Sequence, residues 1–99
     1  MATPLTQDQI AEALEQLPGW HHEAGSLKTR VEFGSFREAI SFIVRLAFHA
    51  EAMNHHPDLH NSYNVVEIAL TTHDAGDEVT LKDVELARQV QQFIWRQPE

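Results

Sequence analysis

The stretch NHHPDLHNSYNVVEIALTTHD, residues 54–74, decides the fold, because it places a helix exit, a turn and a strand in succession. Pro57 disfavours the helical conformation for the residue before it, so the preceding helix is expected to end ahead of the two adjacent histidines. Residues 58–64 predict a short strand and turn, and the β-branched run from Val65 to Thr72 predicts a longer strand. Alternation along that strand gives an expected core face made of Val66, Ile68, Leu70 and Thr72.

Three helix starts are legible on either side of this stretch. Each is a Ser or Thr followed three residues later by an acid or an amide, the pattern of a capping box. The pairs are Thr6/Gln9, Ser35/Glu38 and Thr80/Asp83. They predict helices over Gln7 to Leu17, Phe36 to Met53 and Leu81 to Arg96.

The segment WHHEAGSLKTRVEF, residues 20–33, predicts a hairpin that turns around Ala24-Gly25-Ser26. The order is then helix, two strands, helix, two strands, helix. This order predicts an α+β fold in which one antiparallel sheet is covered on one face by helices. We expect residues 1–99 to form a single domain, since a chain of 99 residues is near the lower limit for a self-sufficient core.

The composition argues against several classes of function. A chain without cysteine has neither disulfides nor a thiolate metal site, and a formal net charge of −8 argues against a phosphate backbone as partner. The N-terminal residues do not resemble a secretory signal, and no apolar run approaches the length of a membrane span. We therefore expect a cytoplasmic protein that binds neither nucleic acid nor membrane.

The apolar residues of the second predicted helix form two stripes. One consists of Phe36, Ile40, Ile43 and Ala47, and the other of Phe42, Leu46 and Met53. One stripe is expected to face the sheet and the second, interrupted by His49, another subunit. The alternative is that neighbouring helices of the same chain cover both stripes.

Three of the seven histidines are expected to meet. His55 and His56 leave the second helix, and His73 ends the long strand on the face away from the helices. Imidazoles titrate near neutral pH, so such a cluster suits general acid–base catalysis. Surface histidines are the alternative, and a metal site is disfavoured because no His-x-His, His-x3-His or HExxH spacing occurs.

The motif positions that match a known family are Glu51, HHP (55–57), Tyr63, His73 and Asp83, and the matching segments around them are ALEQLPGW, YNVV, TTHDAG and DVELA. On these residues the chain resembles the pterin-4a-carbinolamine dehydratases over nearly its whole length. The family fold is three helices on one face of a four-stranded antiparallel sheet, which agrees with the order of elements above. Two departures are visible. Leu59 stands where many members carry tryptophan, and the loop DAGDEV, residues 74–79, is one residue longer and more acidic.

The resemblance implies dehydration of 4a-hydroxytetrahydropterin, the product of aromatic amino-acid hydroxylases, to quinonoid dihydropterin. Carried over by motif position, His55 and His73 transfer protons, and His56 holds the pterin and shares the role of base. Asp83, Tyr63 and Glu51 become candidate substrate-binding residues. Asp83 also reads as a helix cap, Glu51 as a helical partner of His55, and Tyr63 as a turn-packing residue.

The resemblance implies no metal and no cofactor, because the pterin is the substrate. It also implies a homodimer or homotetramer, with the second helix as the candidate interface. Two other roles stay open at this point. One is a non-enzymatic dimerisation or binding module of the same fold, and the other is a pterin-related role in molybdenum-cofactor metabolism.

Overall fold

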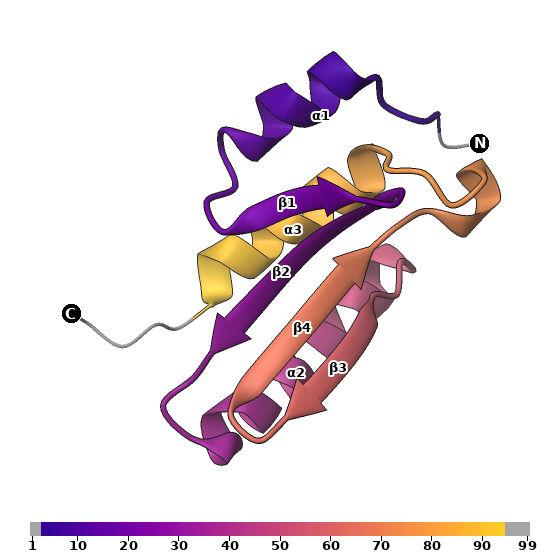
Figure 1. Ribbon diagram of the computed structural model, residues 1–99. Helices are drawn as coiled ribbons and strands as arrows, with labels where there is room; N and C mark the ends of the chain where they lie inside the picture. Colours follow the sequence, from indigo (N-terminus) through magenta and orange to yellow (C-terminus); the bar gives the residue numbers. More distant parts are fainter. Residues whose placement is uncertain (1–2, 95–99) are drawn as a thin grey trace.

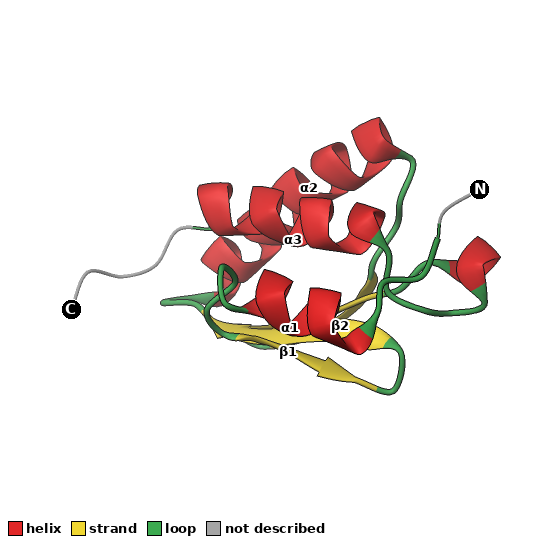
Figure 2. Ribbon diagram, turned by 90° about the horizontal axis from the view of Figure 1, so that it is seen from above, coloured by secondary structure: helices red, strands yellow, loops and turns green. Residues whose placement is uncertain are grey.

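Four strands form one antiparallel sheet, and three helices cover one of its faces (Figures 1 and 2). The structure is a computed structural model that describes residues 3–94. The elements in chain order are α1 (Gln7–Leu14), β1 (Trp20–Glu23), β2 (Ser26–Glu32), α2 (Phe36–Met53), β3 (Asp58–Ser62), β4 (Val65–Leu70), the short 3₁₀ helix η1 (His73–Ala75) and α3 (Leu81–Phe93). The predicted fold class and order of elements are confirmed.

The sheet has the strand order β1-β2-β4-β3, so the two strands with the most apolar inner faces lie at its centre. Leu27 on β2 is opposite Leu70 on β4, and Val31 is opposite Val66. On the other side of β4, Asp58 at the start of β3 is opposite Ala69 near the end of β4. This register places the exit of α2 beside the end of β4.

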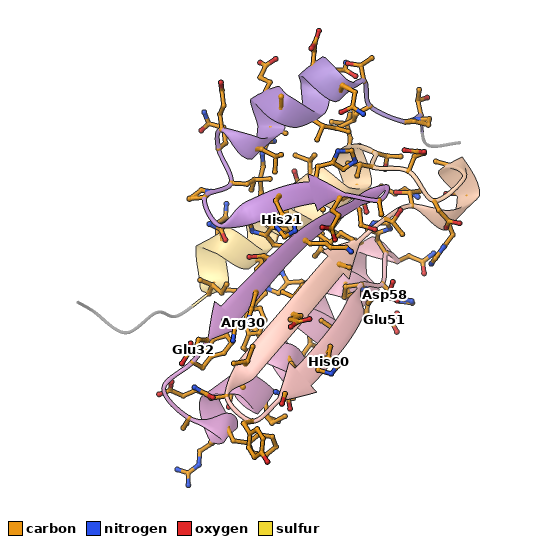
Figure 3. The ribbon with its side chains drawn as sticks, in the orientation of Figure 1. His21, Arg30, Glu32, Glu51, Asp58 and His60 are labelled. Atoms are coloured by element: carbon orange, nitrogen blue, oxygen red, sulfur yellow. The ribbon has the colours of Figure 1, made fainter. Side chains whose placement is uncertain are left out.

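The predicted alternation on β4 is confirmed. Val66, Ile68 and Leu70 have at most 1% exposed surface and pack with the helices. Thr72 continues the same face just beyond the strand and is also buried. No helix of residues 3–94 covers the opposite face of the sheet, which presents polar side chains, among them the labelled His21, Arg30, Glu32, Asp58 and His60 (Figure 3).

The helix starts form as the sequence predicts. Thr6 and Gln9 make a reciprocal capping box, the Ser35 side chain accepts from the Glu38 N–H, and the Thr80 N–H donates to the Asp83 carboxylate. The predicted C-terminal ends of the helices are less accurate. α1 stops at Leu14, three residues before the predicted end at Leu17, because the N–H groups of residues 15–17 already bond three residues back as the chain approaches Pro18. The predicted end of α3 at Arg96 lies outside the described residues.

The predicted interface stripe of α2 is wrong. Phe42 and Leu46 are buried in the core of their own subunit, and Met53 packs partly against it. The inward seam of α2 runs through Ala39, Phe42, Leu46 and Ala50. The small alanines in this seam were not read as apolar contacts, which hid its true direction.

The apolar side chains that α2 leaves exposed are Phe36, Ile40, Val44 and Phe48, with exposed fractions of 58%, 37%, 52% and 74%. They are spaced four residues apart and so share one face of the helix. We call this set the outer α2 stripe.

No helix in residues 3–94 is both long enough and apolar enough to cross a bilayer.

The β1–β2 turn is held against the loop that follows β4. Gly25 adopts φ +77°, and a Cβ at this position would lie 2.5 Å from the backbone oxygen of Asp77. The Thr71 hydroxyl donates to the Gly25 carbonyl at 2.8 Å. Glycine at position 25 thus permits the close approach that fixes residues 72–78, the loop that carries His73.

Candidate active site

His55 is turned into the protein by the end of α2. Asn54 takes the left-handed conformation (φ 51°, ψ 44°) that commonly ends a helix, and the His55 N–H donates back to the Ala50 carbonyl at 3.0 Å. The side chain is 8% exposed. Its Nε2 lies 2.5 Å from Oδ1 of Asp83, which has no exposed surface. The helix exit thus delivers one imidazole to a buried carboxylate.

The Asp83 carboxylate accepts two further hydrogen bonds. Its Oδ2 receives the Thr72 hydroxyl at 2.8 Å and the Thr80 N–H at 2.8 Å. An ionised carboxylate only accepts, so with Asp83 ionised the proton between the two side chains lies on Nε2 of His55. Within residues 3–94 nothing bonds to Nδ1 of His55, and that atom is not among the buried unpaired ones. Nδ1 of His55 is therefore not fully buried.

His56 points away from the core. Its Nε2 lies 2.9 Å from Oε1 of Glu51, and both side chains are mostly exposed. The expectation that Glu51 pairs with His55 four residues later is therefore wrong. The helical spacing fails because Asn54 reverses the chain before His55, which turns His55 inward and brings His56 to Glu51.

His73 lies in the 3₁₀ turn η1, just beyond β4, and not on the strand as predicted. Its Nδ1 is 2.6 Å from Oδ1 of Asp77, and both side chains are exposed. The hydrogen bond and negative charge of Asp77 raise the pKa of His73 above its usual value, with smaller contributions from the charges of Asp58 and Asp74. A larger share of His73 is then protonated near neutral pH.

Replacing Asp77 with asparagine is expected to lower the pKa of His73 toward its usual value. The substitution removes the carboxylate charge, and asparagine tolerates the left-handed backbone (φ 59°) of this position. Since a raised pKa stabilises the fold only while the histidine is protonated, the stability that this contact adds is lost as pH rises through the His73 pKa. The pKa is read from an NMR titration of the imidazole.

The control for this titration is Asp74→Asn, which removes the weakest of the three charges that act on His73. It is expected to shift the His73 pKa less than Asp77→Asn does. Equal shifts in the two variants, or no shift in Asp77→Asn, would contradict the assigned contact.

The three histidines lie at one end of the sheet, and each contacts a carboxylate. The β3–β4 register brings residues 55–58 beside the end of β4, and Asp83 links the two segments because it bonds to both His55 and Thr72. Figure 3 shows Glu51 and Asp58 at this same edge. The partners are Asp83 for His55, Glu51 for His56 and Asp77 for His73.

Two hollows flank this end of the sheet. One, of about 260 Å³, includes Glu51, His56 and Leu59 in its lining. The other, of about 430 Å³, lies on the helix-free face and reaches Asp58. Neither of these two hollows is lined by His55 or His73, so the cleft shared by all three imidazoles stays a prediction.

Two of the predicted substrate-binding residues are not placed to touch a ligand beside the histidines. Asp83 has no exposed surface and reaches outward only through His55. Tyr63 is 84% exposed in the turn between β3 and β4, at the far end of the hairpin from residues 55–58. Its contact with a ligand bound at the histidines stays a prediction without support from this arrangement.

Sequence reasoning missed Thr72, Thr80 and Asp77 as parts of the site. Thr72 was read only as a core position of the strand, although a buried hydroxyl needs a partner and so signals a polar neighbour. Asp77 belongs to the lengthened loop, where an acid four residues after His73 was a visible signal. Within residues 3–94, no group of three or more His, Asp or Glu side chains is placed to hold a metal ion.

Comparison with known proteins bears on the family of this chain. The family model described as pterin 4 alpha carbinolamine dehydratase matches residues 3–93. A protein of Opitutus terrae is 54% identical over 96% of this chain and 98% of its own length. One of Christiangramia forsetii is 40% identical over 95% and 96%. Both are named, provisionally, as pterin-4-alpha-carbinolamine dehydratases.

Solved structures show the same fold. A protein of Brucella melitensis described as a transcriptional coactivator/pterin dehydratase superposes with a TM-score of 0.87 at 33% identity, over 91% of this chain and 97% of that one. A pterin dehydratase-like protein described as a RuBisCO assembly factor superposes with a TM-score of 0.62 at 22% identity, over 79% and 89%, which shows the fold alone. On the family match and the curated relatives, the chain belongs to the pterin 4 alpha carbinolamine dehydratase family.

Proposed function

We propose that this protein dehydrates 4a-hydroxytetrahydropterin to quinonoid dihydropterin and water, with His55, His56 and His73 as the catalytic residues. The observation that carries the proposal is the grouping, at one end of the sheet, of three imidazoles that each contact a carboxylate. Membership of the family supplies the substrate class.

The reaction moves protons and no electrons to or from an outside agent. The bond between the ring carbon and its hydroxyl breaks, the hydroxyl leaves as water after it gains a proton, and the neighbouring ring nitrogen loses a proton as a carbon–nitrogen double bond forms. An acid and a base are therefore sufficient. No metal or organic cofactor forms part of the proposal.

The environments of the histidines suit these two tasks. The raised pKa of His73 favours the protonated ring, which can protonate the leaving hydroxyl. His55 offers an unbonded Nδ1 while Asp83 fixes its other nitrogen, an arrangement that orients a base. His56 and Glu51, which line the hollow of about 260 Å³, are proposed to hold the pterin ring.

Binding of a stable dihydropterin tests the placement of the site. In an imidazole-resolved NMR titration, the resonances of His55, His56 and His73 are expected to shift together. His21 and His22, on β1, serve as internal controls and are expected to stay in place. Shifts confined to the controls, or no saturable shift at all, would contradict the proposed site.

In a cell, this reaction would recycle the pterin that an aromatic amino-acid hydroxylase uses. The non-enzymatic alternative, a dimerisation or binding module, has its own supporting observation in the outer α2 stripe. The two functions make different demands, because only the enzyme requires the histidines. A protein that oligomerises but leaves the carbinolamine unchanged would favour the module.

We expect the protein to form a homodimer or homotetramer through the outer α2 stripe, because association removes these exposed apolar side chains from water. The double variant Val44→Glu/Phe48→Glu is expected to be monomeric, since it would bury like charges in that contact. Sedimentation at micromolar concentration measures the change.

The matched control is Ala11→Glu, which adds an acid at an exposed position of another helix, α1. This variant is expected to sediment like the wild type. A wild type that is monomeric, or a double variant that remains an oligomer, would contradict the interface.

A further inference from the structure

We propose that Thr72 is a positioning residue that couples the anchors of His55 and His73. Thr72 lies between the end of β4 and η1 and is 2% exposed. Its side chain donates a hydrogen bond to Asp83, the partner of His55. Its backbone carbonyl accepts the N–H of Asp77, the partner of His73. The effect on catalysis rests on the function proposed above, whereas the coupling itself rests on geometry.

The side chain of Thr72 is part of a buried chain of hydrogen bonds. Its hydroxyl oxygen lies 2.8 Å from Oδ2 of Asp83 and 2.8 Å from the hydroxyl of Thr80. The carboxylate can only accept, so Thr72 donates to Asp83 and receives the proton of Thr80. The Thr80 oxygen in turn accepts the Lys82 N–H at 3.2 Å.

This order gives every bond a single direction that ends on the carboxylate holding His55. Hydrogen bonds arranged in series in a buried site polarise one another, and the loss of one member leaves its neighbours unpaired. Thr72 stands in the middle of the series. Removing its hydroxyl therefore withdraws a donor from Asp83 and an acceptor from Thr80 in one step.

The backbone of Thr72 fixes the loop that carries His73. Its carbonyl accepts the N–H groups of Ala75 and Asp77, both at 3.1 Å, and its own N–H donates to the Glu78 carbonyl at 3.0 Å. The bond to Asp77 closes a turn in which Asp77 takes φ 59° and its carboxylate reaches His73. A displaced Thr72 therefore displaces the contact between Asp77 and His73.

Thr29 offers a matched control for a buried threonine without this role. It is 3% exposed, and its hydroxyl donates to the Gly19 carbonyl at 2.8 Å. The two threonines share burial and one donated hydrogen bond, but the Thr29 hydroxyl donates to a backbone carbonyl and not to a carboxylate that holds a histidine. The variants Thr72→Val and Thr29→Val therefore remove the same group from two environments.

The test compares Thr72→Val, Thr72→Ser and Thr29→Val by NMR and by steady-state kinetics. Thr72→Val is expected to move the imidazole resonances of both His55 and His73, and to lower kcat by about 10- to 100-fold, with KM changed by less than about twofold. Thr72→Ser, which keeps the hydroxyl, is expected to restore most of kcat. Thr29→Val is expected to leave both rings and kcat as in the wild type.

Two further outcomes keep the test decisive. If Thr72→Val does not fold, NMR of the wild type replaces it. The coupled hydroxyl protons of Thr72 and Thr80 are expected to exchange slowly with water. Rapid exchange of both protons overturns the proposal. If the wild type has no dehydratase activity, the proposed function fails while the imidazole shifts still decide the coupling. Rings and kcat unchanged by Thr72→Val, in an active enzyme, overturn the coupling alone.

Discussion

Replacing Asp83 with asparagine is expected to lower the free energy of unfolding by about 3 kcal/mol. The carboxylate has no exposed surface and accepts bonds from the Thr72 hydroxyl and the Thr80 N–H beside its contact with His55. An amide has one nitrogen that cannot accept, so either the Thr72 and Thr80 donors lose an acceptor, or His55 must move its proton to Nδ1 and accept the amide N–H at Nε2. The loss also weakens the start of α3, where Asp83 closes the capping box.

Urea unfolding measures the change, and Asp77→Asn is its matched control. That substitution makes the same chemical change in another carboxylate that contacts a histidine. In this second pair, however, both Asp77 and His73 are exposed. Water replaces its hydrogen bonds, so the urea midpoint is expected to stay almost unchanged. Equal losses in the two variants would contradict the account of Asp83 as a buried anchor.

Replacing His73 with alanine is expected to lower kcat by about 100-fold, the scale of one general acid–base group. The side chain is exposed, so the fold is expected to persist and the loss to report on chemistry. His55→Ala is expected to reduce kcat at least as much, but it also leaves Asp83 buried without its partner. The comparison of the two variants therefore requires the urea midpoint of each.

His60→Ala is the control for both histidine variants. His60 belongs to the same stretch of sequence, but it lies on the helix-free face of the sheet (Figure 3). Its removal is expected to leave kcat unchanged. A His73→Ala variant that is folded and as active as His60→Ala would remove His73 from the mechanism.

The sequence was sufficient for the elements whose signals are local. Capping pairs marked all three helix starts, and alternation on β4 named the buried face correctly, including Thr72. Pro57 marked the exit of α2, because the residue before a proline avoids the helical conformation. These features depend on neighbours within a few residues, so an individual sequence contains them.

The sequence was insufficient where a contact depends on a reversal of the chain. Helical spacing offered His55 as an alternative partner for Glu51, yet after the left-handed Asn54 it is His56 that contacts Glu51. The inward seam of α2 was misread because its alanines gave no apolar signal. The bond from Thr72 to Asp83 joins residues eleven positions apart across the sheet and α3, and no periodicity predicts it.

The most direct measurement is the ultraviolet decay of freshly generated 4a-hydroxytetrahydropterin with and without the folded protein. The account predicts that the wild type accelerates the decay beyond the same concentration of free imidazole, and that His55→Ala and His73→Ala lose at least about 10-fold of that acceleration. A folded wild type that leaves the spontaneous rate unchanged would contradict the central claim, which is dehydration by this histidine cluster.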